Sequence, residues 1–149
     1  MDPQPATPRA LRVLVADDYR DLTDSAALLL GLWGYRAFVA YDGPSALQGA
    51  RAHRPDVALV DLDLPGGMSG YELARQLRAR PETAAAFLVA MPGSGQERDL
   101  QRCREAGFDR HLLKPFDPCA LERLLWEFSA TRPVPMRTAE RRSASSQTP

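Results

Sequence analysis

The sequence predicts an α/β fold, a doubly wound parallel sheet of five strands in the order 2-1-3-4-5. Five short apolar runs alternate with five segments of helical periodicity between residues 11 and 129. Two of these runs, residues 11–16 and 57–60, stop directly on acidic residues. Because parallel strands end at one edge of the sheet, we expect the functional site at that edge, where the strand order reverses.

The first half of the expected sheet comes from the segment that ends near residue 41. Residues 11–16 form a mostly apolar strand, and residues 19–33 carry apolar side chains at helical spacing. Gly34 stands where a helix would end in a left-handed residue. Residues 35–41 alternate in polarity and predict the second strand.

The middle of the chain supplies the third strand and the helices on either side of it. Pro44 opens the second helix, because proline suits a first helical position, and this helix ends before Pro55. The four apolar residues 57–60 are too few for a helix and predict a buried strand. Ser69 followed by Glu72 is a capping-box pattern, which predicts the start of the third helix.

The last part of the expected fold alternates in the same way. Residues 87–91 are an apolar fourth strand, and residues 108–113 are the fifth. Residues 96–106 form a polar helix with a narrow apolar stripe, so we expect this helix to be loosely held. Asp117 caps the fifth helix, which extends to about Ser129.

Composition excludes several classes of function. The 149 residues include 19 basic and 19 acidic side chains, so the net charge is zero and gives no general attraction to nucleic acid or membrane surfaces. No apolar stretch approaches the ~20 residues of a membrane span, and the N-terminus lacks the features of a signal peptide. We expect a cytoplasmic protein without direct DNA binding and without membrane association.

The chain divides into three expected regions. Residues 1–10 are rich in proline and predict a disordered lead-in to a domain over residues 11–130. Residues 131–149 are rich in Arg, Ser, Thr and Pro and predict a disordered basic tail. This tail is too short to be a DNA-binding output domain. A flexible tail favours a free-standing chain over a piece of a hybrid kinase.

Three carboxylates are expected to meet at the edge where the strands end. Asp17 and Asp18 follow the first strand, and Asp61 ends the third. Neighbouring carboxylates raise one another's pKa unless a cation lies between them. Oxygen ligands with room for water suit a hard divalent ion, so the pattern predicts Mg²⁺ before Zn²⁺.

A lysine at the same edge completes the expected site. Lys114 directly follows the fifth apolar run and supplies positive charge for a phosphoryl group. An acid pair that binds a metal, a central aspartate and a terminal lysine together predict phosphoryl transfer, with Asp61 as the nucleophile and Lys114 as its catalytic partner.

At this point the sequence resembles the receiver domain of bacterial two-component response regulators, in a flavodoxin-like fold similar to single-domain chemotaxis regulators. The resemblance covers roughly Leu11 to Ser129. Each matching segment is a weak signal alone, but their order and spacing are specific. The segments are Leu14-Val15-Ala16-Asp17-Asp18, Val60-Asp61-Leu62-Asp63-Leu64-Pro65, Met68-Ser69-Gly70-Tyr71-Glu72-Leu73, and Ala106-Gly107-Phe108 through Leu113-Lys114-Pro115-Phe116.

The resemblance implies a phosphorelay function and a set of ligands. Asp61 would accept a phosphoryl group from a histidine kinase or a histidine phosphotransfer protein. Asp18 and Asp61 would bind Mg²⁺ directly, Asp17 would act through water, and the backbone carbonyl of Asp63 would complete the protein's ligands. Lys114 would pair with the phosphate, and the peptide bond that follows it is expected to be cis, a modest demand for an X-Pro bond.

Two positions depart from the pattern of the family. Pro92 stands one residue after the fourth strand, where the family has a Thr or Ser whose hydroxyl binds the phosphoryl oxygen and moves inward on activation. Proline removes that donor, so we expect phosphorylation to be retained and coupling through the usual switch to be weak. Ser94 is a candidate replacement or a solvated loop residue. His111 takes the place of the switch aromatic, or it is an edge-strand histidine half covered by its neighbours.

The face made by the fourth helix, the fifth strand and the fifth helix usually carries the output in such families. We therefore expect an unidentified downstream protein to bind there, with a homodimer through the same face as one option.

Two alternatives stay open at this point. The first is a degenerate receiver that binds proteins without phosphorylation, which Pro92 favours and the acid-lysine set argues against. The second is an enzyme, because Asp61 and Asp63 resemble the Asp-x-Asp motif of haloacid-dehalogenase-type phosphatases. In that family the motif lies on the first strand and the metal-binding acid pair comes late, whereas here the pair comes first. Chain order therefore argues against the enzyme.

Overall fold

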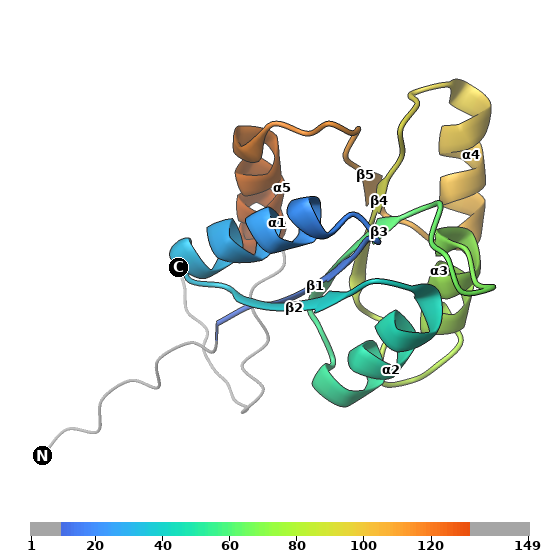
Figure 1. Ribbon diagram of the computed structural model, residues 1–149, viewed down its shortest axis with the longest axis horizontal. Helices are drawn as coiled ribbons and strands as arrows, with labels where there is room; N and C mark the ends of the chain where they lie inside the picture. Colours follow the sequence, from blue (N-terminus) through green and yellow to red (C-terminus); the bar gives the residue numbers. More distant parts are fainter. Residues whose placement is uncertain (1–9, 132–149) are drawn as a thin grey trace, which may run out of the picture. The chain divides into compact units, whose positions relative to one another are not determined.

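The computed structural model describes residues 10–131, whose path is shown in Figure 1. Strands and helices alternate along this part of the chain: β1 (Arg12–Ala16), α1 (Arg20–Leu32), β2 (Arg36–Ala40), α2 (Gly43–His53), β3 (Val57–Asp61), α3 (Gly70–Arg78), β4 (Phe87–Met91), α4 (Glu97–Ala106), β5 (Arg110–His111) and α5 (Pro118–Thr131). The predicted lead-in and basic tail lie, apart from residues 10 and 131, outside the described residues.

The strands form one parallel sheet in the order β2-β1-β3-β4-β5, which confirms the predicted fold class. β3 is central, and all five of its residues are buried. Ala16 pairs with Val60, so the residues that follow β1 lie beside the end of β3. Asp61 itself pairs with Met91 at the end of β4. The register therefore brings the ends of three strands to one edge.

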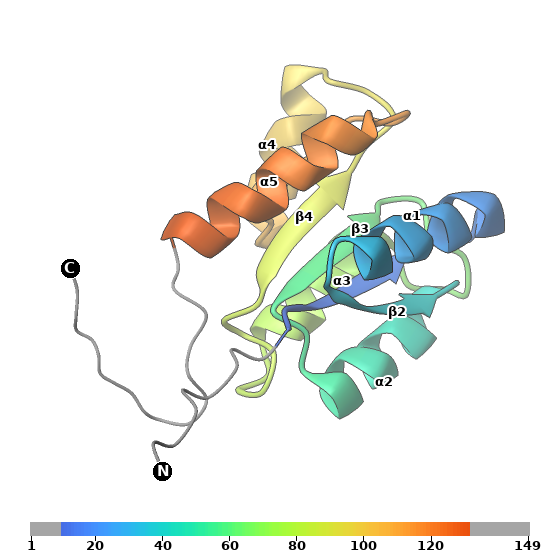
Figure 2. The same ribbon diagram turned by 90° about the vertical axis from the view of Figure 1, so that its left-hand side faces the viewer.

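Residues 11–116, which hold the sheet and helices α1 to α4, form one compact unit, and α5 belongs to a second. In the first unit, α1 covers one face of the sheet, and α2 and α3 cover the other (Figure 2). Alternate strand residues meet α2, α3 and α4 in an apolar core. This core includes Leu14, Ala58, Val60, Leu88, Ala46, Leu73, Leu77 and Cys103. Alternation places one set of strand side chains on each face.

Asp42 caps α2, and the predicted left-handed Gly34 and Ser69 cap are present, whereas the predicted capping box forms only in part. The Asp42 carboxylate accepts a hydrogen bond from the Ser45 N–H at 2.8 Å, and Gly34 has a φ of 93° just beyond α1. The Ser69 hydroxyl accepts from the Glu72 N–H at 3.2 Å. The Glu72 carboxylate, however, accepts from the side chain of Gln76 at 3.1 Å. The hydrogen bonds thus support the Ser69 half of the capping box.

The second unit contains α5, which begins and ends close to the prediction. The Asp117 carboxylate accepts from the Cys119 N–H at 3.1 Å, so Asp117 acts as the predicted cap. The buried apolar residues of α5 are Leu121, Leu124, Leu125 and Phe128. Within residues 10–131, no helix combines the length and apolar character that crossing a membrane requires.

β5 is shorter than the predicted strand over residues 108–113, because its ladder with β4 covers Arg110 and His111 alone. The Leu112 N–H still donates to the Ala90 carbonyl at 2.8 Å, and the Lys114 N–H donates to the Pro92 carbonyl at 2.9 Å. In a parallel ladder donors alternate between the two strands, and the donor between these two bonds would belong to residue 92. Proline has no N–H, so the ladder stops there.

Candidate functional site

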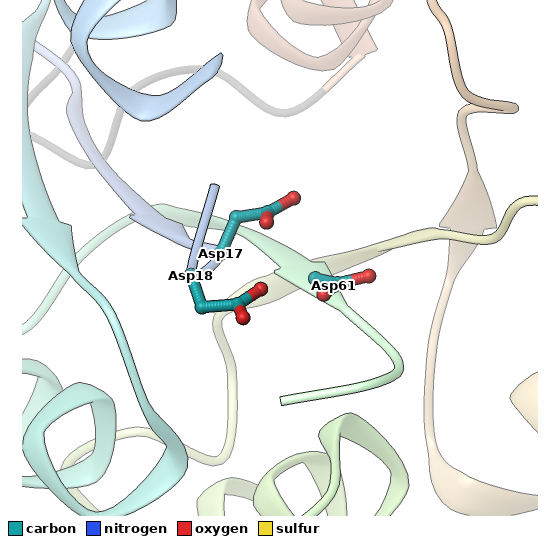
Figure 3. A group of neighbouring side chains, drawn as sticks. All are labelled: Asp17, Asp18 and Asp61. Atoms are coloured by element: carbon teal, nitrogen blue, oxygen red, sulfur yellow. The ribbon is translucent and has the colours of Figure 1, made fainter. Parts of the chain in front are cut away.

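The three predicted carboxylates meet at the edge where β1 and β3 end. Asp17, Asp18 and Asp61 each offer an oxygen within 4.8 Å of the others. Figure 3 shows the three side chains extending into the same space from the ends of these two strands. Their convergence follows from the parallel pairing of β1 with β3, which the alternation of strands and helices had predicted.

The three carboxylates differ in burial and in partners. Asp17 is fully buried, Asp61 is 6% exposed, and Asp18 is exposed. One oxygen of Asp17 accepts from the Tyr19 N–H at 2.9 Å. The other, Oδ2, lies 2.6 Å from the Nζ of Lys114, but this ion pair does not have hydrogen-bond geometry. Burying a carboxylate is costly unless a cation lies beside it, and Lys114 supplies that positive charge.

Lys114 joins the cluster from the other side of the sheet edge. Its Nζ donates to Asp61 Oδ1 at 3.2 Å and also contacts Asp17. The backbone N–H of Lys114 donates to the Pro92 carbonyl, which ties the segment after β5 to the segment after β4. The Lys114-Pro115 bond is cis, as predicted. The four charged groups of the predicted site therefore lie together.

The pKa values of Asp61 and Lys114 reflect their burial and their attraction to each other. Burial first, and the charge of Asp17 second, raise the pKa of Asp61, although Lys114 and the Asp63 N–H oppose this rise. For Lys114, burial is the largest single effect and lowers its pKa. The two carboxylates together outweigh it, so the pKa of Lys114 is raised overall. The lysine thus stays charged beside a carboxylate that is less acidic than usual.

The donor set fits a hard divalent cation. Three carboxylates supply oxygen atoms, one of which is buried without a hydrogen bond, and the exposure of Asp18 leaves space for water ligands. The Asp63 side chain is exposed and is not part of this carboxylate cluster. Its predicted contribution is through the backbone carbonyl, and that stays a prediction.

Gly70 is a residue of the site that the sequence reasoning missed. A Cβ at this position would overlap the carbonyl oxygen of Asp61 and lie 2.7 Å from the Cα of Leu62. The Gly70 N–H also donates to the Leu62 carbonyl at 3.0 Å. The start of α3 therefore packs directly on the backbone that carries Asp61. The glycine after the Ser69 cap was the only sequence signal of this close approach.

The positions that depart from the family pattern lie on the β4 and β5 side. Pro92 is buried directly after β4. The Ser94 hydroxyl accepts from the Gln96 N–H at 3.1 Å, which is the local bond of a loop serine. His111 lies on the short edge strand, where both paired residues are exposed. Its role as a switch residue stays a prediction.

Comparison with known proteins decides the family. The sequence profile described as the response regulator receiver domain matches residues 13–125, about three quarters of the chain.

The chain belongs to the response regulator receiver domain family.

Relatives of this receiver domain include much larger proteins. The virulence sensor protein BvgS of Bordetella pertussis is 38% identical over 138 residues, an overlap of 88% of this chain and 11% of that protein. The sensory transduction protein RegX3 of Mycolicibacterium smegmatis is 38% identical over 104 residues, which cover 70% of this chain and 44% of that protein. The receiver domain thus spans less than half the length of either relative.

Solved structures share its fold. The chemotaxis protein CheY4 of Vibrio cholerae has a TM-score of 0.76 at 26% identity, covering 80% of this chain and 98% of that one. The receiver domain of a sensor histidine kinase from Pseudomonas aeruginosa has a TM-score of 0.74 at 27% identity, with 82% and 99% covered. That domain was solved with a magnesium ion coordinated in its active-site cleft.

These findings confirm the predicted family, fold and class of function. The protein is a receiver domain of two-component systems, and such domains are signalling modules of phosphorelays.

Proposed function

We propose that this receiver domain accepts a phosphoryl group on Asp61 from the phosphohistidine of a histidine kinase or a histidine phosphotransfer protein. The observation that carries the proposal is the position of Asp61, which ends the central strand 3.2 Å from Lys114 and within reach of two further carboxylates. No other element of the sheet edge combines an acidic nucleophile, a cation and a set of metal ligands within residues 10–131.

The transfer is a direct displacement at phosphorus. A carboxylate oxygen of Asp61 attacks the phosphorus atom, a new P–O bond forms, and the P–N bond to the donor imidazole breaks. The imidazole leaves with the electron pair of that bond and takes up a proton. Lys114, already paired with Asp61, is placed to bind an oxygen of the transferred group.

Mg²⁺ is the cofactor that we propose for this site. Asp18 and Asp61 would hold it directly, Asp17 through water, and Asp63 through its backbone carbonyl. A bound divalent cation offsets the negative charge of the transferring phosphoryl oxygens. The cluster of three carboxylates, one of them exposed with room for water ligands, supports the fit.

The output of the site is a contact with another protein. We propose that an unidentified downstream partner, or a second copy of the chain, binds the face that includes α4 and β5. Because Pro92 has no donor and His111 is exposed, coupling along the route through β5 is weak. The proposed location is the cytoplasm, where histidine kinases are phosphorylated with ATP as the donor.

Phosphorylation by a small donor tests the proposed function. With acetyl phosphate and Mg²⁺, the intact mass of the wild-type protein should rise by one phosphoryl group, and the Asp61→Asn variant should show no gain. Asp24→Asn removes an exposed carboxylate from α1 and should behave like the wild type. An unchanged mass gain in Asp61→Asn would refute the assignment.

Pro92 favours a second candidate, a binding module that works without phosphorylation. Phosphotransfer from a panel of histidine kinases would first identify the cognate donor. The signalling output of that donor's pathway is then measured in cells. Wild-type output from cells that carry Asp61→Asn would establish this alternative, whereas loss of output supports the phosphorelay.

A further inference from the structure

A cavity of about 260 Å³ lies at the same edge of the sheet as the carboxylate cluster. Two of its walls are the segments that follow β3 and β4, and the other two come from α3 and α4. Its lining consists of Leu62, Asp63, Tyr71, Pro92, Gly93, Ser94, Asp99 and Arg102. The cavity therefore begins one residue beyond Asp61 and one residue beyond the end of β4.

Arg102 is the only cation among these lining residues. Its guanidinium carbon lies 4.2 Å from the centre of the Tyr71 ring, in a cation–π contact. The Tyr71 ring is itself partly buried and packs against the apolar core. Arg102 itself is exposed, and a contact of this kind at an exposed site is weak enough to exchange. The structure thus shows an exposed positive charge that contacts the Tyr71 ring at the cavity.

Phosphorylation would change the electrostatic balance of this cavity. A phosphoryl group adds about 1.5 to 2 negative charges at neutral pH. Lys114 already contacts both Asp17 and Asp61, and moving it far from Asp17 would leave a buried carboxylate without its counter-charge. On the β4 side the next residue is Pro92, which offers no hydrogen-bond donor. A cation on α4 that reaches the cavity is therefore the group available to neutralise the added negative charge on this side.

We propose that Arg102 is the positioning residue through which a phosphoryl group on Asp61 acts on α4, an inference that rests on the proposed function. In the unmodified protein the guanidinium stays on Tyr71. The added negative charge draws it into the cavity, toward the segment that follows β3. α4 follows Arg102 because its buried contacts with the core are few, being made by Cys103 and Ala106. The moving element is then α4, while β5 stays in place.

The test follows phosphorylation and structural response separately in the full chain. Acetyl phosphate and Mg²⁺ are added, intact mass measures phosphorylation, and amide and arginine Nε–H chemical shifts measure the response. In the wild type we expect the largest amide shifts in α4, a change in the Arg102 Nε–H resonance as it leaves the ring, and small shifts at His111. Arg102→Gln should be phosphorylated to within about twofold of the wild-type extent but lose at least about half of the α4 shifts.

Arg98→Gln is the matched control, because it removes the same charge from an exposed position of the same helix outside the cavity lining. It should keep the full α4 response. Full α4 shifts in phosphorylated Arg102→Gln, or a wild-type response confined to β5, would overturn the inference.

A second pair of variants needs no phosphorylation and so separates the two proposals. In the unmodified protein, Tyr71→Phe retains the ring and should leave the Arg102 Nε–H resonance in place. Tyr71→Leu removes the ring and should shift that resonance together with the α4 amides. If Tyr71→Leu leaves α4 unchanged, the resting contact does not control the helix and the inference is wrong, even where Asp61 is phosphorylated normally.

Discussion

The two sides of Asp61 differ in the kind of group that they present. On the β1 side two carboxylates follow the strand, and Lys114 lies 2.6 Å from one of them, Asp17, and 3.2 Å from Asp61. On the β4 side Pro92 follows the strand, and beyond it lies a cavity whose lining includes the cation Arg102. The first side holds groups suited to bind metal and phosphoryl oxygens, and the second lacks a donor at its nearest position.

This difference teaches that the chemistry of a receiver domain and the transmission of its signal depend on separate groups. The carboxylate cluster is fixed by the register of β1 with β3 and is complete in this chain. The transmission that we propose depends on side chains after β4, on α4 and on β5, where this chain has a proline and a two-residue strand. One side can therefore keep its function while the other is rebuilt.

The largest expected effect is on the backbone that both sides share. Gly70→Ala places a methyl group against the Asp61 carbonyl and should lower the free energy of unfolding by roughly 3 kcal/mol. Gly49→Ala, at an open position of α2, should instead raise it by about 0.5–1 kcal/mol. Urea denaturation measures both. Equal effects of the two substitutions would show that Gly70 does not secure the end of β3.

The next largest expected effect on stability concerns the β4 and β5 side. The Arg78 guanidinium, at the end of α3, donates five hydrogen bonds, three to the turn between α4 and β5 and two to the segment before β4. The acceptors are the carbonyls of Gly107, Ala84 and Ala86 and the carboxylate of Asp109. Arg78→Ala should lower the free energy of unfolding by about 2 kcal/mol. Arg75→Ala removes an exposed arginine from the same helix and should change it by less than about 0.5 kcal/mol.

Metal binding tests the β1 side alone. At a Mg²⁺ concentration ten times the dissociation constant, the metal should stabilise the wild type by about 1.4 kcal/mol, measured as a shift in thermal unfolding. Asp18→Asn removes an exposed carboxylate of the cluster without disturbing the core and should abolish most of this shift. A full Mg²⁺ shift in Asp18→Asn would place the ion elsewhere.

The smallest expected effect is on the pH dependence of stability. The folded-state pKa of Asp61 is raised, chiefly by burial and then by Asp17, so the stability contributed by its protonated form is lost as pH rises through that pKa. In chelator, Asp61→Asn should therefore have a higher urea midpoint than the wild type at pH 7. The difference should vanish below the ordinary carboxyl pKa. A lower midpoint at pH 7 would mean that the pairing with Lys114 outweighs burial.

Sequence reasoning predicted the features that depend on periodicity and on strand polarity. The sheet order, the meeting of Asp17, Asp18 and Asp61, and the approach of Lys114 all follow from apolar runs that end at one edge. These features need no knowledge of side-chain packing, because parallel connections leave few alternatives.

The features that were missed depend on contacts between distant segments. The shortness of β5 results from the missing N–H of Pro92 on the neighbouring strand, and the exposure of His111 follows from it. The contact of Arg102 with Tyr71 joins two helices, and the close approach of Gly70 joins a helix to a strand. No local pattern encodes such pairs, so the sequence alone could not predict them.

The most direct test of the account is to locate the phosphoryl group itself. Borohydride reduces an aspartyl phosphate to homoserine, and peptide mass spectrometry then identifies the modified position. After treatment with acetyl phosphate, the account predicts homoserine at position 61, formed in the presence of Mg²⁺ and strongly reduced in chelator. Homoserine at another acidic position, or none at all, would contradict it.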